Sequence, residues 1–299
     1  MFKPSDYTPH QALVAPARDK AQVWRLVMGV VLVAGVFLVA SQFLHQTLLT
    51  LLGPGGYAAL TGADGRVTQM SVIFLLLSFG LLTLGVAVAL RVVHARGFSE
   101  IIGDFGLFRR QFIAVVTLLV LLNLVVMILP PWDMGGAIEP NVPARLWFVV
   151  LPFALLAIMV QVSAEEFLFR GYLQQQLAAR FASPVIWMSI PAILFGIGHY
   201  MPNEAGENAN LFVIWAVVFG LLMADLTARA GTLAPAIAVH FINNVIALLF
   251  ISMPDGLAGL SLYVSPFSMT DTQQVRAWLP VDFAMMLVSW LAARLALRR

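Results

Sequence analysis

The chain has 299 residues, of which 61% are hydrophobic and only 11% are charged, and its mean hydropathy is +0.90. A soluble domain is roughly 45–50% apolar and about a quarter charged, so this composition indicates a polytopic membrane protein. The pI near 9.2 would suggest nucleic-acid binding in a soluble protein. Here the basic residues fall between hydrophobic runs, so we expect a lipid bilayer and no nucleic acid as partner. The absence of cysteine excludes disulfides, thiolate nucleophiles and cysteine metal ligands.

The first 22 residues are polar, contain three prolines and lack a helical apolar stripe, which predicts a flexible cytoplasmic tail. The hydrophobic run that follows, Leu26–Leu44, is too long for the apolar part of a signal peptide. It also has no small-residue cleavage site behind it, so we expect it to remain as a membrane anchor.

Runs of about 17 to 25 apolar residues recur along the chain, each long enough to cross a bilayer. They predict an all-α polytopic membrane protein with about eight transmembrane helices: Leu26–Leu44, Ser71–Val93, Phe112–Leu129, Leu146 to the glutamates at 165–166, Pro184–His199, Asn210–Leu226, Leu233–Ile251 and Val281–Leu297. We group them as three N-terminal spans in residues 23–145, a core of four in 146–251, and an extracytoplasmic loop with the last helix in 252–299.

The connecting segments carry their own signals. Gly53-Pro54-Gly55-Gly56 predicts a loop after the first span, and Pro130-Pro131 ends the third. The segment Phe98–Phe112 is less regular and is expected to lie along the membrane interface. Residues 253–280 are expected to form a loop with a short amphipathic helix.

The basic residues alternate between the loops as the positive-inside rule requires. With these spans only Arg66, Arg145 and Arg276 fall on one side, while the other fourteen lysines and arginines fall on the opposite side. This asymmetry predicts a multi-pass protein of the cell's inner (plasma) membrane with both termini in the cytoplasm.

Two adjacent carboxylates, Glu165 and Glu166, end the fourth apolar run and are followed by Arg170. Ionisable groups inside membrane segments are costly and generally functional. Glu166 and Arg170 are four residues apart, so they can neutralise each other on one helix face. Glu165 points about 100° away and is the carboxylate left over. The alternative is a purely structural ion pair or helix-packing contact.

Three further polar residues lie in later spans. His199 closes Phe195-Gly196-Ile197-Gly198-His199, whose glycines let a neighbouring helix approach closely. His240 and Asn244 share one face of the seventh span. Asp225, near a span end, needs no catalytic explanation, and surface roles are expected for three other histidines: His10, His45 and His94.

The order Glu-Glu-x-x-x-Arg, Phe-x-x-x-His and His-x-x-x-Asn within membrane spans resembles the CPBP family of CAAX prenyl endopeptidases and bacteriocin-processing enzymes, also called the abortive-infection family. The resemblance covers about residues 163–244. It implies an intramembrane glutamic endopeptidase acting on a prenylated protein or hydrophobic peptide. It also implies that the catalytic residues are Glu165, His199, His240 and Asn244. Glu166 and Arg170 are implied as supporting residues.

A carboxylate in an apolar cavity is a stronger base than one in water, which suits Glu165 to activate a water molecule and then to protonate the leaving amine. His199 could orient that water, while His240 and Asn244 could donate hydrogen bonds to an oxyanion. We expect no metal or other cofactor, although two histidines and a glutamate leave zinc as an alternative. The same polar residues would also suit a transporter or a non-catalytic bacteriocin immunity protein.

The depths of the two histidines do not agree in this scheme. At about 1.5 Å per residue, His240 lies some 10 Å into the seventh span, whereas His199 lies about 22 Å along the fifth. The depth of the site and the side on which it opens are therefore left undetermined by the sequence.

Overall fold

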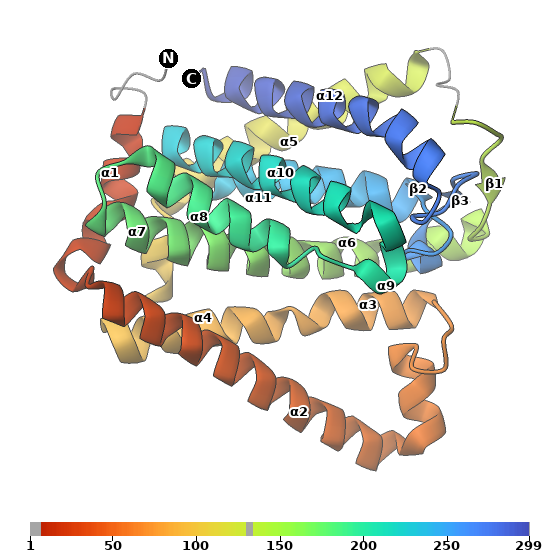
Figure 1. Cartoon of the computed structure of the whole chain (residues 1–299), viewed down its shortest axis with the longest axis horizontal. Coiled ribbons are helices and arrows are strands. Elements are labelled where there is room, and N and C mark those ends of the chain that lie inside the picture. The colour runs from red at the N-terminus through yellow and green to blue at the C-terminus, as the bar shows by residue number, and fades with distance from the viewer. Residues whose placement is uncertain (1–6, 130–133, 299) are drawn as a thin grey trace.

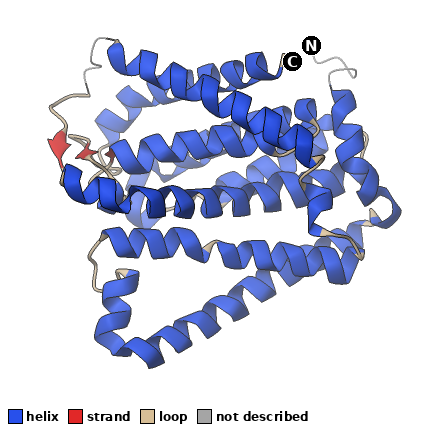
Figure 2. Cartoon of the chain, turned by 180° about the vertical axis from the view of Figure 1, so that it is seen from behind, coloured by secondary structure: helices blue, strands red, loops and turns tan. Residues whose placement is uncertain are grey.

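The computed structural model describes residues 7–129 and 134–298. Within these residues the chain crosses a helical bundle eight times, and the N- and C-terminal ends lie at the same end of it (Figure 1). Figure 2 shows from behind that the protein is almost entirely helical. The all-α prediction is confirmed.

Six of the helical passes are long and apolar enough to cross a membrane, and two are shorter apolar helices. The passes are, in chain order, α2 (Val23–Thr61), α3 (Gln69–Ser78) with α4 (Gly80–His94), α5 (Phe105–Ile128), α6 (Ala144–Glu166) continuing through a π-helical turn (Phe167–Gln174) into α7 (Gln175–Arg180), α8 (Pro184–Ile197), α10 (Ala209–Ala230), α11 (Ala234–Val245) with a π-helical end (Ile246–Phe250), and α12 (Thr272–Leu297). The short ones are α8 and α11 with its extension.

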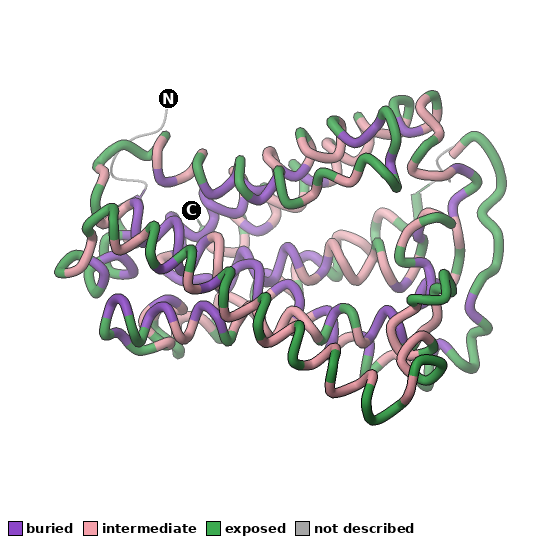
Figure 3. Tube along the Cα trace, turned by 60° about the horizontal axis from the view of Figure 1, so that its bottom comes forward, coloured by how far each residue is buried: buried purple, intermediate pink, exposed green. Residues whose placement is uncertain are grey.

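Burial follows the position of each helix in the bundle. The buried residues gather on the inner helices (Figure 3), and α10 is the most enclosed of the long passes. The peripheral helix α2 exposes large apolar side chains such as Leu38, Phe43 and Leu51. Because lipid solvates apolar side chains, an apolar outer surface of this kind is expected for a membrane protein.

Several predicted boundaries are corrected. Gly53 interrupts α2 with φ +67°, a conformation that favours glycine, but Pro54 restarts the helix, so the predicted loop is only a break. The expected interfacial segment contains a 3₁₀ turn (Phe98–Ile101) and the start of α5, which Asp104 caps by accepting a hydrogen bond from Leu107 N–H. The fourth pass continues fourteen residues beyond the glutamates because the helix is not broken there. Pro130-Pro131 lies outside the described residues.

The loop between the seventh and eighth passes also differs from the prediction. It contains a 3₁₀ turn (Ala258–Leu260) and two short strands, β2 (Ile251–Ser252) and β3 (Tyr263–Val264), in place of an amphipathic helix. β3 lies between β2, which is parallel to it, and β1 (Glu139–Pro140), which is antiparallel. The last helix begins at Thr272, nine residues early, because Asp271 caps it.

The predicted flexible tail is wrong for its described part. Residues from Thr8 to Lys20 form α1 (Thr8–Val14) and a 3₁₀ helix (Ala15–Lys20), which pack against α7 and α10. Tyr7, His10 and Leu13 are buried there. Tertiary packing orders this segment, which is too short to show a helical apolar period.

Candidate functional site

The glutamate pair lies at the end of α6, where the helix changes to its π-helical turn. Glu165 is 8% exposed and Glu166 is fully buried. Arg170 Nη1 donates to Glu166 Oε1 at 2.8 Å, and its Nη2 donates to the carbonyl of Gly220 on α10 at 3.3 Å. The predicted pairing of Glu166 with Arg170 is therefore confirmed. π-helical turns of this kind are frequent at functional sites.

His240 on α11 lies between the two glutamates. Its Nδ1 is 2.8 Å from Glu166 Oε1, and its Nε2 is 3.6 Å from Glu165 Oε2. A carboxylate oxygen accepts a hydrogen bond, so Nδ1 carries the proton and Nε2 faces Glu165. The Nε2–Oε2 distance is too long for a direct hydrogen bond but suits two groups that share a water molecule.

The two glutamates differ in what they contact. Glu166 Oε1 accepts from both Arg170 and His240. Glu165 Oε2 is buried and has no hydrogen-bond partner among the described residues. Glu166 Oε2 is also buried without a hydrogen-bond partner among the described residues, but the charge of this carboxylate is already neutralised by Arg170. Glu165 is thus the carboxylate available to a substrate or water.

His199 follows the end of α8 and is half-buried. Its Nδ1 donates to the carbonyl of Phe195 at 2.8 Å, and its ring lies 4.5 Å from the Phe195 ring. Phe195 also packs on His240, with ring centroids 6.0 Å apart, and Arg170 lies over it at 4.7 Å. The structure therefore brings His199 to the cluster through Phe195, and no hydrogen bond joins it to the other predicted site residues within the described chain.

Gly196 allows this arrangement. A Cβ atom built on Gly196 would lie 2.4 Å from a methyl group of Val217 and 2.9 Å from the carbonyl of Val213 on α10. The close approach predicted from the glycines of this motif is thus observed at Gly196. It holds the end of α8, with Phe195, against α10.

Asn244 lies one turn beyond His240 on α11. Its side-chain Nδ2 donates to Gln161 Oε1 at 2.8 Å. Gln161 is buried and lies one turn before Glu165 on α6. Polar contacts thus join α6 to α11 at three places: Gln161 to Asn244, Glu165 to His240 and Glu166 to His240. Gln161 is not among the site residues predicted from the sequence. Its spacing of four from Glu165 could have indicated it, because such residues share a helix face.

The turn before the seventh pass does not lie at the surface of the protein. The residues from Thr232 to Ala234 have no exposed surface. A Cβ atom on Gly231 would lie 2.7 Å from the carbonyl of Pro9, so the N-terminal segment covers this turn. Helix α11 starts beneath that cover, and its His240 ring lies 6.0 Å from the ring of Phe195, so the two histidine motifs meet in the folded protein.

A mainly apolar cavity of about 360 Å³ adjoins the polar cluster. Asn243, next to Asn244, contributes to its wall, together with Trp215 of α10 and Trp278 of α12. Trp215 stacks on Phe219, whose ring lies 5.0 Å from His240. The lining of the cavity also includes Ser252 of β2 and Val275 near the start of α12, and these elements lie at the end of the bundle opposite the chain termini (Figure 1).

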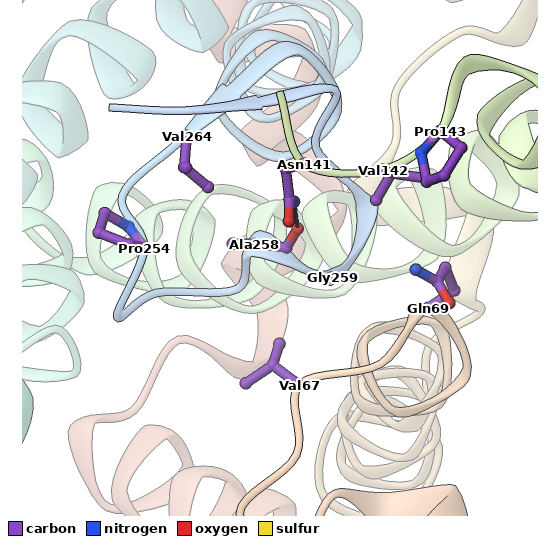
Figure 4. Close-up of a pocket in the computed structure, with 9 residues that line it drawn as sticks. All are labelled: Val67, Gln69, Asn141, Val142, Pro143, Pro254, Ala258, Gly259 and Val264. Atoms are coloured by element: carbon purple, nitrogen blue, oxygen red, sulfur yellow. Dashed lines mark hydrogen bonds between the residues drawn. The ribbon is translucent and has the colours of Figure 1, made fainter. Parts of the chain in front are cut away.

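Another cavity, of about 300 Å³, lies among the connecting loops (Figure 4). Asn141 at its centre donates hydrogen bonds to the carbonyls of Ala258 and Ser261 and so holds the loops together. None of its lining side chains is titratable. It is therefore not a candidate for acid–base chemistry.

Two predictions for the other histidines are wrong. His10 and His94 are both buried, and His94 Nε2 is hydrogen-bonded to the hydroxyl of Tyr172 at 2.9 Å. His45 is half-buried and bonded to the Tyr57 hydroxyl. Within the described residues no group of three His, Asp or Glu side chains is placed to hold a metal ion.

The fold and the site thus define a multi-pass membrane protein with a buried Glu/Glu/Arg/His cluster inside the bundle. Residues 146–246 match the family described as type II CAAX prenyl endopeptidase Rce1-like. The resemblance read from the three motifs is confirmed over these residues, which include the whole cluster. The family that this segment matches is one of membrane proteases.

The chain is also similar to an uncharacterized protein, YyaK, of Bacillus subtilis. The two are 25% identical over 263 residues, which cover 83% of this chain and 84% of YyaK. This similarity extends well beyond the motif region. No solved structure matches the chain.

Proposed function

We propose that this protein is an intramembrane endopeptidase of the CAAX prenyl protease type, which hydrolyses a peptide bond of a prenylated or hydrophobic peptide with a glutamate-activated water. The observation that carries the proposal is the buried Oε2 of Glu165, which has no hydrogen-bond partner among the described residues and lies 3.6 Å from His240 Nε2. We place the protein in the inner (plasma) membrane with both termini in the cytoplasm.

Glu165 is the general base in this proposal. A water held between Glu165 Oε2 and His240 Nε2 attacks the carbonyl carbon of the substrate, and its proton passes to Glu165. The same proton then goes to the leaving amine nitrogen as the C–N bond breaks. Glu166 accepts the Nδ1 proton of His240 in a hydrogen bond and so keeps Nε2 directed at the reacting water. We therefore propose this role for His240 in place of the oxyanion donor expected from the sequence.

Asn244 and His199 contact the substrate in this proposal. Asn244 uses one amide hydrogen to bond Gln161, which leaves the second for the developing oxyanion. An oxyanion donor in a water-poor site contributes about 3–4 kcal/mol to transition-state stabilisation. His199, with Nδ1 bonded to Phe195, has Nε2 available to contact the substrate or water.

The apolar cavity beside Asn243 offers room for an apolar part of the substrate. A non-catalytic immunity or binding protein would use the same cavity without cutting. A zinc-dependent protease would need His199, His240 and Glu165 around one ion. The proposal is metal-free because no group of three such side chains among the described residues is placed around a common point.

The experiment is cleavage of a panel of prenylated-cysteine peptides by the purified protein in detergent, with matched non-prenylated peptides, with and without a strong chelator. We expect turnover that survives chelation. Turnover lost on chelation and restored by zinc would favour the metal alternative. Binding of the peptides without any turnover would favour the immunity or binding role.

A further inference from the structure

A cavity of about 610 Å³ opens between the N-terminal segment and the α7–α8 connection, at the end of the bundle where the chain termini lie (Figure 1). Tyr7, His10, Gln11 and Arg18 contribute one wall, and Arg180 and Trp187 belong to the other. None of the candidate catalytic residues lines this cavity. The positive-inside asymmetry predicts that this end lies at the cytoplasmic face of the membrane.

The charged groups of this cavity are all cationic. Arg18 and Arg180 are exposed, and neither makes an ion pair within the described residues. Arg18 Nη2 donates to Gln11 Oε1, which holds the guanidinium beside the opening. Among the described residues no carboxylate lines the cavity, and Asp225, which lies behind Tyr7, is bonded to Tyr7 and Arg229. The cavity therefore favours an anion.

His10 adds a buried donor to the wall. It is 1% exposed, and burial lowers its pKa to about 4, so the ring is neutral near pH 7. The amide nitrogen of Gln174 lies 3.5 Å from His10 Nε2. An amide nitrogen only donates, so Nε2 accepts and Nδ1 carries the ring proton. Nδ1 has no hydrogen-bond partner among the described residues, and a buried N–H is expected to find an acceptor.

The start of α8 lies at the same cavity. Pro184 is its first residue and lines the opening, and Ser183 makes no side-chain cap. Pro184 has no N–H and the Ile186 N–H donates to the Ser183 carbonyl at 3.1 Å, so this helix start contributes only the positive end of its dipole, which favours an anion. Two guanidinium groups, a neutral imidazole donor and a helix start suit the several oxygens of a phosphate group better than a single carboxylate.

We propose that this cavity binds a phosphate group, carried either by the headgroup of an anionic lipid or by a soluble phosphate ester. At a cytoplasmic membrane surface, anionic headgroups are the abundant source of such groups. Trp187, with its ring 4.7 Å from that of His10, forms an apolar wall against which the glycerol part of such a ligand would lie. The site is independent of the proposed protease activity.

The test uses the full chain purified in detergent and native mass spectrometry to measure bound phosphatidylglycerol, with a neutral diacylglycerol as comparator. Soluble glycerol 3-phosphate is titrated in a second arm. The variant is Arg18→Gln with Arg180→Gln, and the control is Arg91→Gln, an exposed arginine in the last turn of α4 that does not line the cavity. Thermal unfolding confirms that each variant is folded.

We expect the Kd for phosphatidylglycerol to rise at least about tenfold in the double variant and to stay unchanged in the Arg91 control. A different result would be that glycerol 3-phosphate displaces the lipid from wild type and fails to bind the double variant. That result would support the phosphate site and identify a soluble phosphate ester as its ligand. Equal binding by wild type and the double variant, or equal binding of the neutral lipid, would overturn it.

Discussion

Two buried acid–arginine pairs with the same spacing lie in this bundle and differ in their surroundings. Asp225 and Arg229 on α10 are bonded at 2.9 Å, and Glu166 and Arg170 are bonded at 2.8 Å. Asp225 Oδ1 also accepts from the Tyr7 hydroxyl, and its Oδ2 accepts from the Trp290 indole. Both carboxylate oxygens of Asp225 are therefore fully bonded.

The pair at Glu166 has a different neighbour. The adjacent Glu165 keeps a buried carboxylate oxygen without a partner among the described residues, and His240 lies between the two glutamates. An acidic residue four before an arginine thus predicts an ion pair in both places. Whether the pair is structural or supports chemistry depends on the groups around it, which come from other helices.

The largest effect on folding is expected at the Asp225–Arg229 pair, in which both carboxylate oxygens are hydrogen-bonded. Asp225→Asn leaves Arg229 buried without its carboxylate partner and should lower the free energy of unfolding by about 3–5 kcal/mol. Denaturation in detergent measures it, with Asp64→Asn in an exposed ion pair as control, where at most about 1 kcal/mol is expected. An Asp225 variant as stable as the control would contradict a structural role for this pair.

The N-terminal segment that completes the Asp225 network should be sensitive to acid through His10. Its folded pKa of about 4 lies below the value of 6.5 for an unfolded chain, so the unfolded state binds the proton more readily. Its contribution to stability is complete above pH 6.5 and is lost as the pH falls towards 4, by about 3 kcal/mol. Unfolding at a series of pH values measures it.

His10→Gln should remove this part of the acid sensitivity. Gln11→Ala, at the exposed neighbouring position, is the matched control and should keep it. The same loss of stability between pH 6.5 and 4 in the His10 variant would assign the acid sensitivity to other groups.

A smaller effect, on kcat, is expected at Gln161, which positions Asn244 beside the glutamate pair. Gln161→Met removes the acceptor of the Asn244 amide and should lower kcat up to about tenfold with little change in KM, because a neutral hydrogen bond contributes about 0.5–1.5 kcal/mol. Asn123→Leu, which removes a bond to its own helix at Leu119, is the control. A change confined to KM would instead place Gln161 in substrate binding.

The smallest effect is expected at the Tyr7 hydroxyl. Tyr7→Phe removes one of several hydrogen bonds to Asp225 and should cost about 1 kcal/mol of stability, because the bond to Arg229 remains. Thermal unfolding compared with that of Asp225→Asn gives the share of the network due to the N-terminal segment. A loss as large as that of Asp225→Asn would mean that the segment, rather than the ion pair, holds this end together.

The sequence predicted the features that depend on local spacing. Eight passes follow from the lengths of the apolar runs, and the Glu166–Arg170 bond follows from residues four apart on one helix. The three motifs also identified the segment that matches the protease family. These signals lie within single helices and do not depend on how the bundle is arranged.

Features that depend on packing between distant segments were not predictable. The burial of His10 and Tyr7 results from contacts with α7 and α10, more than 150 residues away in the chain. The same segment covers the turn before α11, where Pro9 lies against Gly231. The bond from Asn244 to Gln161 requires the register between α6 and α11, which neither helix encodes alone.

The most direct test of the central claim compares Glu165→Gln with wild type for peptide turnover in detergent, with unfolding midpoints measured on the same preparations. If Glu165 is the general base, kcat should fall by about 10³-fold while the midpoint changes little, because Glu165 forms no ion pair with an arginine among the described residues. A Glu165→Gln protein that keeps wild-type turnover would contradict the assignment of this carboxylate as the base.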